Sequence, residues 1–186
     1  MCGIFAVIGS REVSSLLIDG LRKLEYRGYD SAGIATIDSL NNYQIGQLNV
    51  TKSKGKLINL SNLIKKKPPK GHVGIAHTRW ATHGKPNENN AHPHLDSTGQ
   101  IAVVQNGIIE NYRELSESLK LKGIKFTSET DTEIIPHLIG IEIEQSLANG
   151  SSPNEQTLLI AVKKVLTVLE GTYAIAVIWS KAPNAL

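Results

Sequence analysis

The chain has very little cysteine: one residue among 186. A single cysteine excludes a disulfide within the chain, which is typical of proteins of a reducing compartment. No apolar run approaches the roughly 20 residues that span a bilayer, and the segment Met1–Ile8 lacks the basic region of a secretory signal. We therefore expect a cytoplasmic protein that does not enter a membrane.

Neither the composition nor the net charge is extreme. With 40% hydrophobic and 20% charged residues, the chain resembles ordinary globular proteins and not disordered ones. Its length suits one domain with a substantial core or two small ones, and we favour one. The net charge is +3, and the basic excess gathers in Lys65–Lys70, where two prolines and no aromatic residue favour a solvated connector over a nucleic-acid site.

Apolar patterns predict both strands and helices along the chain. We expect strands over residues 3–8, 31–38, 43–50, 72–77, 100–105 and 172–180. We expect helices over residues 13–24, 57–65 and 155–169, and two more that begin near Asn111 and Thr130 with the spacing of a capping box. This order favours an α+β fold or a layered α/β sandwich. Because the last strand runs almost to Leu186, we expect the domain to continue beyond it.

The polar segment Lys85–Gly99 has almost no apolar periodicity and is predicted to be a long loop. It contains His92 and His94 on either side of a proline, and His77 and His83 are nearby in the sequence. These histidines suggest a metal site, but the chain has no His-Glu-x-x-His string and no paired cysteines. We expect no metal and no other cofactor.

The only cysteine stands directly after Met1, so removal of one residue makes Cys2 N-terminal. An N-terminal cysteine carries a thiol with a pKa of ~8.5 and an α-amine with a pKa of ~7.7–8. The unprotonated amine can take the thiol proton, so that one residue supplies both nucleophile and general base. The alternative is an incidental cysteine at a frayed terminus or a small buried hydrophobe.

Two arginine-containing segments also have both a structural and a functional interpretation. Tyr26–Gly33 is either a glycine-shaped turn between a helix and a strand or part of a site, and its content of Arg, Tyr and Asp is high for a connector. Arg79, at the expected end of a strand, is either a surface charge or the bidentate partner of a substrate carboxylate.

Asn106, Gly107 and Asp131 are ambiguous in the same way. An Asn-Gly pair between apolar residues is the strongest short-range signal of a tight hairpin, and on local sequence we favour that interpretation. The alternative is an oxyanion hole formed by the Asn106 amide and the Gly107 N–H. Asp131 is either a first-turn acid that interacts favourably with the helix dipole or a carboxylate that binds an ammonium group.

Five strings occur together in the chain: Met1–Ile4, Tyr26–Gly33, His77–Gly84, Asn106–Asn111 and Thr130–Glu133. With them the whole chain resembles the class II glutamine amidotransferase family, and within it the glutaminase domains of glutamine:fructose-6-phosphate aminotransferases. The Tyr-Arg-Gly-Tyr-Asp-Ser-Ala-Gly string favours these over the similar amidophosphoribosyltransferases. The resemblance implies an α+β fold of the N-terminal-nucleophile hydrolase type, a four-layer αββα sandwich with two mainly antiparallel sheets.

The resemblance implies a catalytic role for five residues. Cys2, freed of Met1, would attack the side-chain amide of glutamine to form a thioester and ammonia, and water would then release glutamate. Its α-amine would shuttle the proton, and Arg27 and Gly28 would help to position that terminus. Asn106 and Gly107 would form the oxyanion hole.

The resemblance also implies a set of substrate-binding residues. Arg79 would bind the α-carboxylate of glutamine and Asp131 its α-ammonium group, so that opposite charges hold the far end of the substrate. Trp80, Thr82 and His83 would lie on the loop that closes over glutamine.

Further implications concern the protein beyond this chain. Residues 1–186 would be a glutaminase domain truncated at its C-terminal end, without the sugar isomerase domains that bind fructose 6-phosphate. In a full-length homodimer, the ammonia would convert that sugar to glucosamine 6-phosphate. Two alternatives stay open: the glutaminase domain of another class II amidotransferase, or a non-catalytic glutamine-binding module that retains Met1. Gln105 stands where many relatives have His, which we interpret as tolerated variation.

Overall fold

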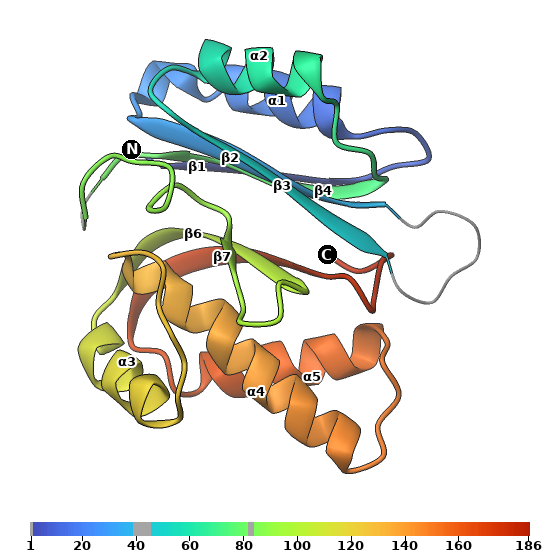
Figure 1. The fold of residues 1–186 in the computed structure, drawn as a ribbon, viewed down its shortest axis with the longest axis vertical. Coiled ribbons are helices and arrows are strands. Elements are labelled where there is room, and N and C mark those ends of the chain that lie inside the picture. The colour runs from blue at the N-terminus through green and yellow to red at the C-terminus, as the bar shows by residue number, and fades with distance from the viewer. Residues whose placement is uncertain (1, 39–45, 82–83) are drawn as a thin grey trace.

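Two antiparallel sheets lie face to face in the computed structural model, which describes residues 2–38, 46–81 and 84–186 (Figure 1). The first sheet has the order β1-β4-β2-β3 and the second the order β5-β6-β7. The strands of the first sheet are β1 Gly3–Ile8, β2 Ser31–Asp38, β3 Gln47–Lys54 and β4 Val73–Arg79. Those of the second are β5 His94–Leu95, β6 Ile101–Ile109 and β7 Gly171–Trp179.

Helices cover the outer face of each sheet (Figure 1). Over the first sheet lie α1 Ser14–Arg22 and α2 Leu57–Lys66. Over the second lie α3 Tyr112–Leu121, α4 Ile134–Ala148 and α5 Glu155–Leu166. Two short 3-10 turns, η1 Glu25–Arg27 and η3 Asp131–Glu133, precede β2 and α4. The predicted four-layer α+β sandwich is confirmed.

Each interface between neighbouring layers has its own apolar core. Leu17, Leu21 and Leu60 are fully buried between the first sheet and its helices, and Ile139 and Trp179 belong to the corresponding core of the second sheet. The middle core, between the two sheets, consists largely of small and β-branched side chains: Ala35, Ile37, Val73, Ile75, Ala102, Val104 and Ile178. The inner faces of the two sheets therefore pack against each other through these side chains.

The strand β2 is buried along its whole length, because helices cover one of its faces and the second sheet the other. Its sequence is therefore mostly small and apolar up to Ile37, without the regular polar alternation of a half-exposed strand. The expected bounds of β1 and β2 are both confirmed. The third expected strand begins later than predicted, at Gln47, and residues 43–45 lie outside the described part.

The hairpin interpretation of Asn106-Gly107 is wrong. β6 continues through both residues to Ile109, and Gly107 lies opposite Tyr173 of β7 with a φ of 113°. A Cβ added to Gly107 would lie 2.0 Å from the Thr172 carbonyl oxygen. Pairing with a strand far along the sequence thus overrides the local turn preference, and glycine is required because the backbones approach so closely.

Neither capping-box prediction is correct, although both helices form. Asn111 and Thr130 make no side-chain capping bond to their own helices. Asn111 instead donates through Nδ2 to the Val168 carbonyl at 2.9 Å and accepts from the Glu170 N–H at 3.1 Å. The side-chain groups that the local pattern predicted to cap the helix therefore form hydrogen bonds with residues remote in sequence.

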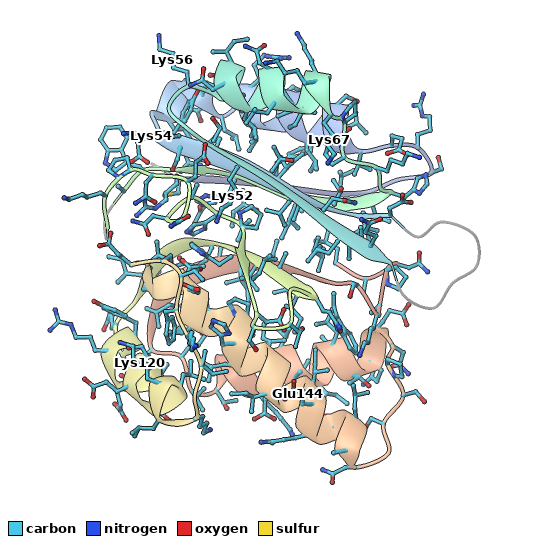
Figure 2. The ribbon with its side chains drawn as sticks, in the orientation of Figure 1. Lys52, Lys54, Lys56, Lys67, Lys120 and Glu144 are labelled. Atoms are coloured by element: carbon cyan, nitrogen blue, oxygen red, sulfur yellow. The ribbon has the colours of Figure 1, made fainter. Side chains whose placement is uncertain are left out.

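The expected long loop 85–99 contains a short strand and crosses the first sheet. Its strand β5 pairs with β6, with His94 opposite Val103. Lys52 of β3 reaches this segment, and its Nζ donates to the carbonyls of Asn89 at 3.3 Å and Pro93 at 3.2 Å (Figure 2). Burial lowers the pKa of Lys52 to about 8. Lys56, Lys67 and Lys120, by contrast, are exposed to solvent (Figure 2).

Within the described residues, no helix is both long enough and apolar enough to cross a membrane.

Gly33 marks the point at which the crossing segment touches β2. A Cβ added there would lie 2.2 Å from the His92 carbonyl oxygen, so Gly33→Ala must push the crossing segment away. We expect the variant to lower the free energy of unfolding by about 1–3 kcal/mol, measured by urea denaturation. Gly9→Ala is the control, because its nearest neighbour would be 3.5 Å away. Equal stability of the two variants would contradict this close approach.

Candidate active site

The single cysteine lies where the ends of the two sheets meet. Gly3 pairs with Thr78, so Cys2, one residue before β1, is adjacent to the end of β4. The Cys2 Sγ accepts the Trp80 N–H at 3.3 Å and lies 3.6 Å from the Trp80 carbonyl oxygen, to which it can donate. From the second sheet, the Asn106 Nδ2 donates to the Cys2 carbonyl at 3.4 Å. The structure thus brings together Cys2, Trp80 and Asn106, three of the predicted site residues.

Among the strands of the described residues, none covers one edge of the far half of β6, because β5 pairs with only Ala102 and Val103. At this edge the Gln105 N–H donates to His92 Nδ1 at 3.2 Å, and the Ile109 N–H donates to Asp131 Oδ2 at 2.8 Å. Because N–H groups alternate in direction along a strand, the N–H of Gly107 points to this same edge. Asn106 and Gly107 therefore supply two donors on consecutive residues of β6, and the Asn106 amide is the one that contacts Cys2.

Arg79 is the last residue of β4, and its side chain is buried with only 4% exposed. Its Nη2 donates to the Gly84 carbonyl at 3.5 Å, and its Nη1 lies 3.9 Å from Asp30 Oδ1. Asp30 also accepts the Ala81 N–H through its other oxygen and donates its own N–H to the Arg79 carbonyl at 2.7 Å. Asp30 therefore binds the backbone on either side of Trp80, a role that was not predicted from the sequence.

Asp30 belongs to the string Tyr26–Gly33, so the sequence contained a signal that could have marked it as a site residue. In the same string, Arg27 and Gly28 lie at the end of η1 and are half-buried. Gly28 has a φ of 74°, and a Cβ added to it would lie 2.8 Å from the Trp80 ring. The string therefore contacts both the backbone next to Trp80 and the Trp80 ring. Trp80 in turn contacts Cys2. Thr82 and His83, the other predicted residues of this loop, lie outside the described residues.

Three buried histidines, His77, His92 and His94, form a row that begins next to Asn106. The rings of His77 and His92 stack with centroids 4.1 Å apart, and His94 meets His92 edge-on at 4.8 Å. Burial is the main cause that lowers the pKa of His77 to about 4 and the pKa values of His92 and His94 well below their usual range. All three rings are therefore neutral near pH 7. Among the described residues, no three His, Cys, Asp or Glu side chains group as metal ligands do.

Hydrogen bonds connect this row to the residues of β6. His77 Nε2 lies 2.9 Å from Asn106 Oδ1. Since His92 Nδ1 accepts the Gln105 N–H, its Nε2 carries the proton and donates to Thr132 Oγ1 at 3.3 Å, and Thr132 donates to Gln105 Oε1 at 2.7 Å. Gln105, interpreted from the sequence as tolerated variation, is thus buried within the network. These contacts could not be predicted from local sequence patterns, because the three histidines are distributed over two strands and a crossing segment.

Comparisons with known proteins show which family the chain resembles. The model of a family described as glutamine amidotransferase domain matches residues 77–186. A glutamine–fructose-6-phosphate aminotransferase (isomerizing) of Thermosynechococcus vestitus is 53% identical over 187 residues, which cover 100% of this chain and 28% of that relative. The enzyme of the same name from Clostridium acetobutylicum is 48% identical, with 99% and 28% covered. The chain therefore spans about a quarter of the length of these curated relatives.

Solved structures show the same fold. The glutamine phosphoribosylpyrophosphate amidotransferase of Bacillus subtilis, complexed with ADP and GMP, superposes with a TM-score of 0.75 at 26% identity and covers 97% of this chain and 35% of its own. A class-II glutamine aminotransferase domain protein from Silicibacter pomeroyi has a TM-score of 0.53 at 14% identity, over 97% of this chain and 73% of its own. The second likeness concerns the fold alone.

The neutral histidine row predicts a loss of stability in mild acid. His77 has a pKa of about 4 when folded and about 6.5 when unfolded, so below pH ~6.5 the unfolded chain binds the proton first. The stabilisation is complete above that pH and is lost as the pH falls towards 4. From His77 alone we expect the free energy of unfolding to fall by about 2 kcal/mol between pH 7 and pH 5.

Urea denaturation at both pH values measures this fall. His77→Gln should reduce the pH dependence, whereas His72→Gln, which changes a half-buried imidazole outside the row, should retain it. An identical pH dependence for His77→Gln and the unaltered protein would contradict the prediction.

Proposed function

We propose a glutaminase function for this chain, which belongs to the glutamine amidotransferase domain family. The observation that carries the proposal is the position of Cys2: its Sγ lies 3.3 Å from the Trp80 nitrogen, while the Asn106 amide donates to its carbonyl at 3.4 Å. A thiol next to a side-chain amide donor supplies a nucleophile and a donor for the developing oxyanion, which acyl transfer from an amide requires.

The chemistry proceeds in two steps once Met1 has been removed. The α-amine of Cys2 takes the thiol proton, the thiolate sulfur attacks the side-chain carbonyl carbon of glutamine, and the carbon–nitrogen bond breaks as the amine returns the proton to the departing nitrogen. Ammonia leaves, and a thioester to Cys2 remains. Water then attacks the thioester, which regenerates the thiol and releases glutamate.

Asn106 and Gly107 form the oxyanion hole in this proposal. Two observations support this role. The Asn106 Nδ2 donates to the Cys2 carbonyl, and the Gly107 N–H points outward from the edge of β6 opposite β7. Each donor faces the oxygen that becomes negative when the sulfur attacks, and each contributes roughly 3–4 kcal/mol to transition-state stabilisation in comparable sites.

Two charged side chains bind the charged groups at the α-carbon of glutamine. Arg79 binds the α-carboxylate with its planar fork of donors, and Asp131 binds the α-ammonium group. Asp131 keeps one carboxylate oxygen on the Ile109 N–H at 2.8 Å, which leaves the other oxygen to accept from the substrate. Trp80, with half its side chain exposed, covers the bound glutamine together with Thr82 and His83, which lie outside the described residues. Arg27 and Gly28 position the N-terminal residue.

For the whole protein we propose the reaction named for its curated relatives, the transfer of glutamine nitrogen to fructose 6-phosphate. Residues 1–186 would form its glutaminase domain, with sugar isomerase domains in the remainder, assembly as a homodimer and a cytoplasmic location. The 53% identity to a relative of that name supports this over the phosphoribosyl transfer suggested by a structural neighbour at 26%. A glutamine-binding module that retains Met1 remains the alternative.

Cys2→Ala tests the nucleophile. We expect the variant to lose glutaminase activity by at least about 10³-fold, because no other thiol is present in the chain, while it retains glutamine binding and stability. Glutamate release measures the activity, calorimetry the binding, and mass spectrometry the identity of the N-terminal residue. Activity that survives the substitution would eliminate Cys2, and an unprocessed Met1 without activity would favour the binding module.

Arg79→Lys tests the carboxylate clamp. A point charge replaces the bidentate fork, and we expect KM for glutamine to rise about 10- to 100-fold, from a loss of roughly 1.5–3 kcal/mol, with a smaller change in kcat. Arg22→Lys is the matched control, because Arg22 is exposed on α1 and pairs with Asp19. A KM that both variants leave unaltered would argue against the clamp.

A further inference from the structure

The oxyanion hole requires Asn106 to present its nitrogen and not its oxygen. The two ends of a side-chain amide have nearly the same shape, and rotation by half a turn exchanges a donor for an acceptor. An oxygen turned towards the developing negative charge would repel it. Some group must therefore hold the amide in one orientation before the substrate arrives.

His77 is the residue in contact with the oxygen end of this amide. Its Nε2 lies 2.9 Å from Asn106 Oδ1, and the ring is completely buried. A ring N–H at Nε2 donates to the oxygen and so directs the Asn106 NH₂ group to the opposite side, where it donates to the Cys2 carbonyl. The reversed amide would bring its own N–H group against the N–H of His77.

The orientation of the His77 ring is itself constrained by its neighbours. The ring stacks on His92 at 4.1 Å with an interplanar angle of 14°. His92 is held at both nitrogens, by the Gln105 N–H and by Thr132 Oγ1, and Thr132 in turn donates to Gln105 Oε1. The chain of hydrogen bonds thus begins and ends at Gln105, the residue next to Asn106 in β6, and it fixes the His92 ring against which the His77 ring packs.

We propose that His77 is a positioning residue that sets the polarity of the oxyanion hole by holding the Asn106 amide with its NH₂ group towards Cys2. The inference rests on the proposed glutaminase function and adds a residue that does not touch the substrate. Its contribution passes entirely through Asn106, which makes it separable from the general packing role of a buried ring.

A double-mutant cycle in the full-length protein measures the kinetic consequence. We expect His77→Leu to lower kcat for glutamine hydrolysis about 10²-fold, because one donor is lost from the hole, with KM little changed. His77→Gln, whose side-chain amide can also donate to Asn106 Oδ1, should recover most of the rate. In the background of Asn106→Ala, His77→Leu should have almost no further effect on kcat.

His137→Leu is the control for the loss of a buried imidazole. His137 is 4% exposed and lies on α4, edge-on to Phe126 and 3.8 Å from Glu133 Oε1, so we expect a change in stability and an unchanged kcat. Additive effects of His77→Leu and Asn106→Ala, or a loss of kcat that His77→Gln does not recover, would overturn the proposal.

The orientation of the Asn106 amide can also be measured without an activity assay. In NMR spectra, the side-chain amide signals of Asn106 should shift in His77→Leu and remain close to their original position in His77→Gln. Unshifted Asn106 signals in His77→Leu would overturn the positioning role. If the unaltered protein released no glutamate, the proposed function would fail, whereas the amide signals would still decide the orientation.

Discussion

The site depends on the extension of β6 through Asn106 and Gly107 against β7. This pairing satisfies one edge of the strand, and among the described strands only the short β5 pairs with the other edge. At that second edge the Gln105 N–H donates to His92 and the Ile109 N–H donates to Asp131, while the Asn106 side chain between them donates to the Cys2 carbonyl. A hairpin at Asn106-Gly107 would have ended the strand and removed the surface on which all of these groups converge.

The second sheet reaches the nucleophile because the two sheets approach so closely. Gly33 allows the His92 segment to cross β2 in contact with its backbone, and Lys52 holds that segment through two carbonyls. The same closeness buries three imidazoles between the layers and keeps them neutral. Burial of polar rings has a cost in stability, and hydrogen bonds to Asn106, Thr132 and backbone groups offset part of it.

Much of the fold could be predicted from the sequence because its signals are local. The apolar runs of β1 and β2 and the helical period of α1 and α2 predict those elements nearly to the residue. The failures at Asn106-Gly107 and at the two predicted capping boxes share one cause, which is a distant partner. The Asn106-Gly107 pair has a strong turn preference that β7 overrides, and the side chains of Asn111 and Thr130 bond to residues outside their helices.

For the site, the sequence by itself determined the inventory: one cysteine with the capacity to become N-terminal, an arginine at a strand end, and an Asn-Gly pair in an apolar setting. Only the tertiary structure decided which of these meet and in which orientation. Register between β1 and β4 brings Cys2 to Trp80, and contact between the sheets brings His77 to Asn106. The physical reason is that the partner and the direction of each hydrogen bond depend on how segments remote in sequence pack together. Local sequence patterns carry no information about that packing.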